Sequence, residues 1–189
     1  MVFVLSNCIP TFLAKTVYDI DFNTLYANGK RVILFDLDNT LASYAETEAT
    51  PYQLELNQKL RNIGFKIYIA SNNRLYRTKT YTEKFIVDDY LVLARKPFTR
   101  KLKTFLKKNN INKQEMIMIG DQLLTDIACA NKLKVDCVLV HSISRKTEKW
   151  YTKINRKREV IKLKRIEREN PTLASNIRMI IGRKSDHNE

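Results

Sequence analysis

Two aspartates, Asp36 and Asp38, directly follow the apolar run Val32-Ile33-Leu34-Phe35. An unbroken run of β-forming residues is typical of a strand that is buried on both faces of a parallel sheet. Such sheets bind ligands at the carboxyl ends of their strands, and side chains two positions apart point to the same side. Neighbouring carboxylates repel each other unless a cation or a proton lies between them. The pair therefore predicts a metal-assisted reaction centre, with a solvated turn as the alternative interpretation.

Polar side chains also follow three later apolar runs: Ser71 and Asn72 come first, then Lys96, then Asp121 with Asp126 five residues further on. Taken singly, each of these residues is a common choice for a cap, a turn or an exposed surface. The carboxyl ends of parallel strands, however, meet at one edge of the sheet. The ordered series of an aspartate pair, a serine, a lysine and an aspartate is therefore expected to converge on one site.

This series resembles the haloacid dehalogenase (HAD) superfamily of phosphatases. The matching segments are Asp36-Leu37-Asp38-Asn39-Thr40, Ser71-Asn72-Asn73, Lys96-Pro97 and Gly120-Asp121-Gln122-Leu123-Leu124-Thr125-Asp126. Ala49-Thr50-Pro51 and the upstream Thr16-Val17-Tyr18-Asp19-Ile20-Asp21 look like the YqeG-like branch of subclass III type A. That branch is related to phosphatases of phosphatidylglycerophosphate, a cardiolipin precursor.

The resemblance implies that the matching carboxylates hydrolyse a phosphate monoester. Asp36 would be the nucleophile and would form an aspartyl-phosphate. Asp38 would act first as general acid and then as general base. Mg²⁺ would be held by Asp36, the backbone carbonyl of Asp38 and Asp121, with water completing its shell.

The resemblance also implies roles for the remaining polar residues of the series. Ser71, Asn72 and Lys96 would bind the phosphate group. Thr40 would support the loop after the first strand, and Asp126 would orient either metal-bound water or Lys96.

Apolar runs alternate with helical patterns from residue 31 to about residue 142. This alternation predicts an α/β protein, with a three-layer Rossmann-like HAD fold around a parallel five-stranded sheet. The expected strands cover residues 31–37, 66–70, 89–94, 116–119 and 137–140. Thr50 and Gly64 are expected to cap the two ends of one helix, and Pro97 is expected to start another. Residues 1–145 are expected to form the phosphatase domain, with the N-terminal segment packed on it, and residues 146–189 an extension.

The intervals between the motifs are short. Thirty residues, 41–70, separate Thr40 from Ser71, and 24 residues, 72–95, separate Ser71 from Lys96. Neither interval can hold a sizeable inserted domain. The phosphatase is therefore predicted to be capless, with a site open to the headgroup of a large or surface-bound substrate.

The end of the chain is strongly basic. The 189 residues have a formal net charge of +14, and residues 145–168 carry eleven basic side chains against three acidic ones. We expect a basic, helical extension with a disordered end and an irregular apolar stripe that includes Trp150, Ile154, Ile161 and Leu163. Such a helix either contacts an anionic membrane or packs on the domain by its stripe.

The preferred function from sequence is Mg²⁺-dependent hydrolysis of a lipid phosphate such as phosphatidylglycerophosphate. Two alternatives stay open: a HAD phosphatase of a soluble metabolite or nucleotide, and a basic nucleic-acid-binding protein with a vestigial site. The three cysteines have no paired spacing, and no signal peptide or membrane span is visible. These features predict a cytoplasmic protein that contacts the inner membrane surface peripherally.

Overall fold

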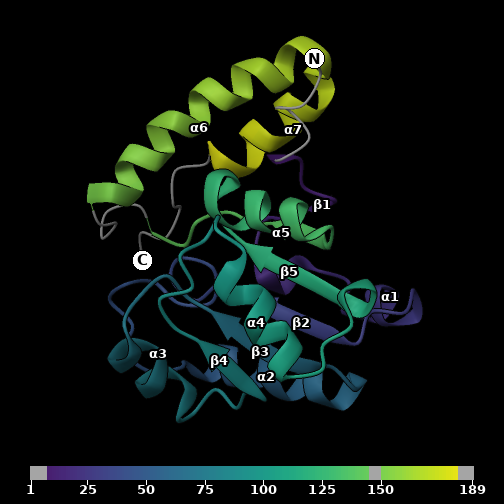
Figure 1. Ribbon diagram of the computed structural model, residues 1–189, viewed down its shortest axis with the longest axis vertical. Helices are drawn as coiled ribbons and strands as arrows, with labels where there is room; N and C mark the ends of the chain where they lie inside the picture. The colour runs from purple at the N-terminus through teal and green to yellow at the C-terminus, as the bar shows by residue number, and fades with distance from the viewer. Residues whose placement is uncertain (1–7, 145–149, 183–189) are drawn as a thin grey trace.

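The computed structural model describes residues 8–144 and 150–182. Its centre is one parallel sheet (Figure 1). The strand order in this sheet is β1-β6-β5-β2-β3-β4. The strands are β1 Phe12–Leu13, β2 Val32–Phe35, β3 Lys66–Ala70, β4 Asp89–Leu91, β5 Met116–Gly120 and β6 Asp136–Leu139. The chain therefore has the α/β, Rossmann-like architecture that the sequence predicts.

The prediction of five strands is wrong, because the described sheet has a sixth strand, β1. It pairs with β6 through Phe12 and Leu13, which lie opposite Val138 and Leu139. A strand of two residues is too short to show a periodic pattern, so only its pairing identifies it. The predicted packing of the N-terminal segment is seen from Cys8 onward; residues 2–7 of that segment lie outside the described residues.

Helices cover both faces of the sheet. One face carries α1 Phe22–Ala27, α2 Pro51–Ile63 and α3 Leu75–Thr82, and the other carries α4 Arg100–Lys108 and α5 Ala128–Leu133. Short 3-10 helices at Val17–Asp19 and Lys113–Glu115 and a π-helix, η4 Leu123–Ile127, complete the domain. Thr50 caps the start of α2, and Gly64, whose φ of 108° suits glycine, caps its end, as the sequence predicts.

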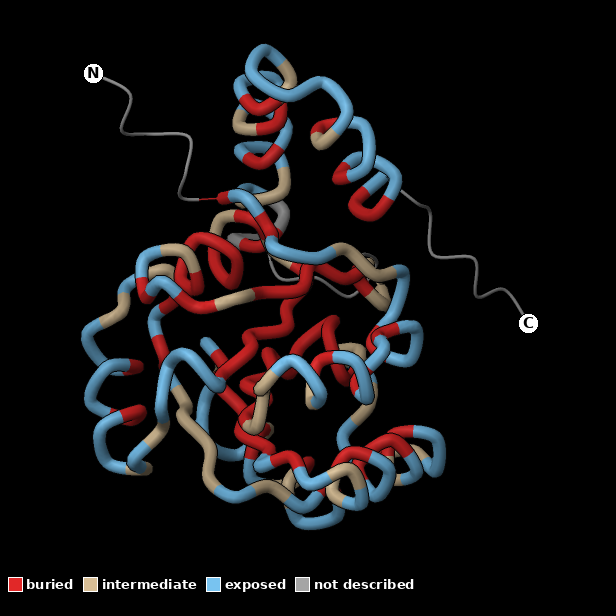
Figure 2. Tube along the Cα trace, turned by 90° about the vertical axis from the view of Figure 1, so that its right-hand side faces the viewer, coloured by how far each residue is buried: buried red, intermediate tan, exposed pale blue. Residues whose placement is uncertain are grey.

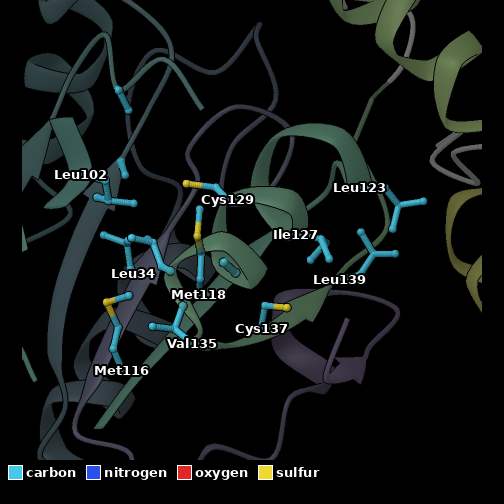
Figure 3. Close-up of a cluster of buried hydrophobic side chains, with 14 of the residues drawn as sticks. Leu34, Leu102, Met116, Met118, Leu123, Ile127, Cys129, Val135, Cys137 and Leu139 are labelled. Carbon is cyan, nitrogen blue, oxygen red and sulfur yellow. The ribbon is translucent and has the colours of Figure 1, made fainter. Parts of the chain in front are cut away.

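The core lies in two clusters, one on each face of the sheet. Ile33 and Phe35 point into one cluster, whereas Val32 and Leu34 point into the other, as the period of two along a strand requires. Figure 3 shows the second cluster, in which Leu34 and Met118 lie near Leu102 of α4. Buried residues run through the middle of the molecule, while the outer turns of the helices are exposed (Figure 2).

The connection between β4 and α4 differs from the prediction at both ends. Strand β4 ends at Leu91 instead of Ala94, and α4 begins at Arg100 instead of Pro97. Leu93 and Arg95 have positive φ angles of 48° and 58°, which no strand accommodates. The irregular segment between β4 and α4 places Lys96 at the carboxyl edge of the sheet.

The C-terminal extension is helical, as predicted, and forms α6 Trp150–Glu169 and α7 Pro171–Ile181. The two helices pack together at one end of the domain (Figure 1). Leu163 and Ile166 of α6 and Ile177 of α7 are part of the core.

The predicted apolar stripe of α6 is only partly right. Leu163 is buried, but Ile154 and Ile161 are exposed, and the side chain of Trp150 lies outside the described residues, as do residues 183–189 with the predicted disordered end. No helix in the described ranges is both long and apolar enough to cross a membrane.

Candidate active site

Strands β2, β3 and β5 are in register at their carboxyl ends, where Phe35 lies opposite both Ile69 and Ile119. The backbone N–H of Asp36 donates to the carbonyl of Ile119 at 2.8 Å and so extends this pairing by one residue. A cavity of about 410 Å³ opens at this edge. Four of the residues expected in the site line it, namely Asp36, Asp38, Asn72 and Lys96.

Lys96 lies between two buried carboxylates. Its Nζ is 2.7 Å from Oδ1 of Asp36 and 2.6 Å from Oδ1 of Asp126. Burial lowers the pKa of Lys96, but Asp126 and Asp36 outweigh this effect and hold that pKa above its ordinary value. Lys96 is therefore a permanent cation at the centre of the site.

Burial raises the pKa of Asp36 well above its ordinary value; Lys96 opposes this rise, and Asp126 and Asp121 add to it. The carboxylates of Asp36, Asp121 and Asp126 each offer an oxygen, and these oxygens lie within 4.8 Å of one another. Three clustered carboxylates are a donor set of hard oxygens that suits Mg²⁺. A cation there would offset the repulsion by which Asp126 and Asp121 add to the effect of burial on the pKa of Asp36, so the residues fit a metal ion.

Gly120 allows Asp126 to approach this cluster. A Cβ atom at position 120 would lie 2.4 Å from Cβ of Asp126, so any other residue would push Asp126 away. Oδ2 of Asp126 also accepts hydrogen bonds from the backbone N–H of Gln122 and the hydroxyl of Thr125, both at 3.2 Å. The supporting residue Asp126 thus contacts Lys96 and belongs to the carboxylate cluster.

Asp38 has different partners from Asp36. Its Oδ1 accepts from Nε of Arg77 at 2.6 Å, and its Oδ2 accepts from Ser71 Oγ at 3.2 Å and from Asn73 Nδ2 at 3.3 Å. Arg77 also donates to the backbone carbonyls of Ser43 and Glu46. The carboxylate of Asp38 is thus held outside the cluster, and the metal role expected for its backbone carbonyl stays a prediction.

The polar residues expected to bind phosphate also support one another. Ser71 is fully buried, and its hydroxyl accepts from the backbone N–H of Asn73 at 2.9 Å. The amide of Asn72 accepts from the backbone N–H of Lys96 at 2.8 Å and donates to its carbonyl at 3.1 Å. Asn72 therefore fixes the segment that carries Lys96.

Asp121 is contacted from two distant parts of the chain. The hydroxyl of Thr40 donates to its Oδ1 at 3.5 Å, which is a long hydrogen bond. Arg156 of α6 donates to its backbone carbonyl at 2.8 Å and also to its carboxylate. The supporting role expected for Thr40 therefore includes a contact with a carboxylate of the cluster.

Helix α6 forms part of the site, which sequence reasoning missed. Thr152, Asn155 and Arg158 line the same cavity as Asp36, so the site is less open than the short intervals between the motifs indicated. Glu159 accepts from Arg156 at 3.3 Å and from the backbone N–H of Leu124 at 3.4 Å. Burial raises the pKa of Glu159 to about 7, although Arg156 opposes this rise.

Arg77, Arg156 and Arg158 are site cations that the sequence analysis did not single out. Arg77 lies on the first turn of α3, directly after the Ser71-Asn72-Asn73 segment, and this position was an available signal. Arg156 had no such signal, because it is one of many basic residues in the extension.

Comparisons with known proteins identify the family of this chain. The model of the family described as "Mitochondrial PGP phosphatase" matches residues 1–143. "Probable phosphatase YqeG" from Bacillus subtilis (strain 168) is 29% identical over 151 residues, which cover 80% of this chain and 87% of that protein.

Two solved structures match parts of this chain. A putative 3-deoxy-D-manno-octulosonate 8-phosphate phosphatase from Vibrio cholerae matches with a TM-score of 0.49 and 15% identity over 66% of this chain and 75% of that one. The Moraxella catarrhalis 3-deoxy-D-manno-octulosonate 8-phosphate phosphatase, in complex with magnesium, phosphate and KDO, matches with a TM-score of 0.45 and 14% identity. This match covers 64% of this chain and 83% of the Moraxella catarrhalis chain.

The fold, the order of the strand-end residues and the family match define the chain as a HAD-type phosphatase. Within that class, it belongs to the mitochondrial PGP phosphatase family.

Proposed function

We propose that this phosphatase hydrolyses the phosphate monoester of an anionic lipid, such as phosphatidylglycerophosphate, with Asp36 as the nucleophile. The observation that carries the proposal is the buried contact of Asp36 with Lys96 beside a second carboxylate, Asp38, that is held by separate partners. Two carboxylates in different environments can do two different jobs in one reaction.

In the first step, an oxygen of Asp36 attacks phosphorus, and the bond between phosphorus and the lipid oxygen breaks. Asp38 donates its proton to that leaving oxygen, so the products are an aspartyl-phosphate and the lipid alcohol. In the second step, Asp38 removes a proton from water, and the water oxygen attacks phosphorus. The bond between phosphorus and the oxygen of Asp36 breaks, so inorganic phosphate leaves, and both the carboxylate of Asp36 and the proton on Asp38 are restored.

The surrounding residues keep the charges of this reaction in balance. Lys96 offsets negative charge on Asp36 and on the phosphoryl oxygens, while Ser71 and Asn72 bind and position the phosphate. Asp36, Asp121 and the backbone carbonyl of Asp38 would hold Mg²⁺, with Asp126 in support, and the ion would supply further positive charge to the phosphoryl group.

A lipid substrate is supported by the family to which the chain belongs and by its charge. The net charge of +14 favours an anionic surface, and each basic residue near such a surface contributes about 1 kcal/mol of attraction. Peripheral contact with the inner membrane surface follows from the same reasoning. Arg158, in the wall of the cavity, is a cation that could face an anionic headgroup.

The test is phosphate release with and without Mg²⁺ from a panel of lipid phosphates, sugar phosphates and nucleotides. We expect Mg²⁺-dependent release from the lipid phosphates, and a loss on the order of 10³-fold or more in Asp36→Asn. Asp136→Asn is the matched control. Asp136 is the first residue of β6, so it lies at the amino ends of the strands, away from the site, and it pairs with Lys30.

Three results would contradict the proposal in different ways. Turnover restricted to soluble esters would refute the lipid substrate and leave the phosphatase chemistry intact. Unchanged activity in Asp36→Asn would refute the nucleophile. Salt-sensitive binding of nucleic acid with no hydrolysis of any ester would favour a binding protein with a vestigial site.

A further inference from the structure

A second cavity, of about 870 Å³, lies beside β4 at the edge of the sheet. Its floor is apolar, because Ala94 and Phe105 are buried and Tyr90 and Leu91 are half-buried. This volume is within the range of cavities that enclose a drug-sized ligand. We call this cavity the β4 groove.

The exposed rim of the β4 groove is cationic. Arg95, Arg100, Lys101 and Lys108 are all exposed, and none of the ten residues that line the groove in the described chain is acidic. Lys108 pairs with Asp89 at 3.0 Å, and Lys101 donates to the carbonyl of Leu93 at 2.8 Å, so these two are anchored by their neighbours. An apolar floor below a cationic rim is complementary to an apolar chain that carries an anionic group.

The β4 groove and the catalytic cavity share a wall. Along the segment from Ala94 to Phe98, Ala94 and Arg95 line the groove, Lys96 and Pro97 line the catalytic cavity, and Phe98 lines both. The backbone N–H of Ala94 donates to the carbonyl of Ser71 at 3.0 Å, which ties this wall to the catalytic residues. A ligand with its phosphate at Lys96 could therefore extend past Phe98 into the groove.

We propose that the β4 groove binds an acyl chain of the lipid whose phosphate occupies the catalytic cavity. This inference rests on the proposed function and adds the structural basis for its choice of lipid. The β4 groove binds the acyl chain, and the cations of its rim attract the anionic headgroup of the lipid. The exposed ring of Phe98 lies between the β4 groove and the catalytic cavity. A soluble phosphate ester has no group that fills the groove and gains nothing from it.

The test fills the β4 groove without touching the catalytic cavity. Thr104 lies on α4, is exposed and lines the groove, so Thr104→Trp places a large ring there without disturbing the core. Thr172→Trp, on the exposed start of α7, is the matched control. The substrates are dihexanoyl phosphatidic acid, below the concentration at which it aggregates, and its deacylated form, glycerol 3-phosphate.

We expect the wild-type enzyme to prefer the acylated substrate on the order of tenfold to a hundredfold in kcat/KM, because each buried methylene contributes about fourfold. Thr104→Trp should remove most of this preference by raising KM for the acylated substrate, and should leave the hydrolysis of glycerol 3-phosphate unchanged. Thr172→Trp should behave as wild type. Equal preference in wild type and Thr104→Trp would overturn the proposal.

A binding measurement separates failure of the groove from failure of the proposed function. Hexylphosphonate and methylphosphonate carry the same anionic group, and neither is hydrolysed. Calorimetry should show tighter binding of hexylphosphonate to the wild type and to Asp36→Asn, with the difference lost in Thr104→Trp. If the chain adds no affinity, or if Thr104→Trp instead dissociates a dimer of this protein, the groove is not a lipid site, whatever the activity.

Discussion

The carboxyl edge of the sheet and helix α6 supply charges to the same active site, but they do so in different ways. At the sheet edge, Asp36, Lys96 and Asp126 are buried, and the Nζ of Lys96 lies within 2.7 Å of an oxygen of each carboxylate. Helix α6 carries many solvated cations and directs only a few of its side chains, such as Arg156, to the site. At the sheet edge the charged side chains contact one another in the core of the site, whereas α6 adds single charges to that cluster from outside.

This difference teaches that net charge and functional charge are separate properties. Most basic residues of α6 are exposed, and surface charges of this kind act mainly through the field of the whole protein. Arg156 and Glu159 differ from them: Arg156 is half-buried and contacts Asp121, and Glu159 is buried and accepts from the backbone N–H of Leu124 in η4. Variants of the two regions should therefore differ in the size and in the kind of their effects.

The largest effect is expected from Lys96→Met, which removes the cation between two buried carboxylates. Activity should fall on the order of 10³-fold, and the metal-free protein should lose about 3–5 kcal/mol of stability, because buried charges lose their partner. Phosphate release and thermal unfolding with and without Mg²⁺ measure both effects. Lys59→Met, at an exposed position of α2, is the control. An active and stable Lys96→Met protein would contradict the central place of Lys96.

Arg77→Lys tests how Asp38 is positioned. Lysine cannot reproduce the planar fork that binds Asp38, Ser43 and Glu46 together. We expect kcat to fall about tenfold to a hundredfold with little change in KM, together with a shifted pH profile. Arg74→Lys, at the exposed start of α3, should be neutral. A change in KM alone would instead mean that Arg77 binds substrate directly.

Arg156→Gln tests whether α6 competes with a cation at Asp121. Arg156 donates to the carboxylate of Asp121, so its removal should tighten Mg²⁺ binding about threefold to tenfold. Titration calorimetry of the variant measures this, and Arg165→Gln, exposed on the same helix, is the control. Weaker Mg²⁺ binding would show that Arg156 positions Asp121 for the metal instead of opposing it.

The packing of α6 should depend on pH. Glu159 has a pKa of about 7 when α6 is packed, against an ordinary value of 4.5. Between pH 4.5 and 7, the packed state of α6 binds more protons than the unpacked state. Helix α6 should therefore become less firmly packed as the pH rises through this range, with no further change above about pH 7. Hydrogen exchange of α6, corrected for its intrinsic pH dependence, should accelerate across that window, by up to about 300-fold where unpacking returns Glu159 to its ordinary pKa. Glu159→Gln should flatten this response, and an unchanged response would assign it to another group.

The fold was largely predictable from the sequence, because buried strands and helix caps leave local patterns. Val32 to Phe35 form an unbroken apolar run, and Thr50 and Gly64 bound α2. The sequence has no such pattern for strand β1, which was not predicted, or for the start of α4 at Arg100, three residues after the predicted start at Pro97. Their limits depend on pairing with β6 and on backbone conformations at Leu93 and Arg95, which are set by the folded structure.

The candidate site was predictable to the same extent. Asp36, Ser71, Lys96 and Asp121 could be placed together, because each follows a strand of a parallel sheet. Arg77, Arg156 and Glu159 were not identified, because a basic or acidic side chain on a helix gives no sign of the direction in which it points. The wall that α6 contributes to the cavity was missed for the same reason.

The sequence by itself determined the class of chemistry, because the residue types at four strand ends and their order depend only on local burial and spacing. The tertiary structure decided which cations contact which carboxylates. Arg77 reaches Asp38 across 39 positions, and Arg156 reaches Asp121 across 35. Contacts at such separations exist only after the sheet and α6 have packed, so the charge balance of the site is a property of the fold.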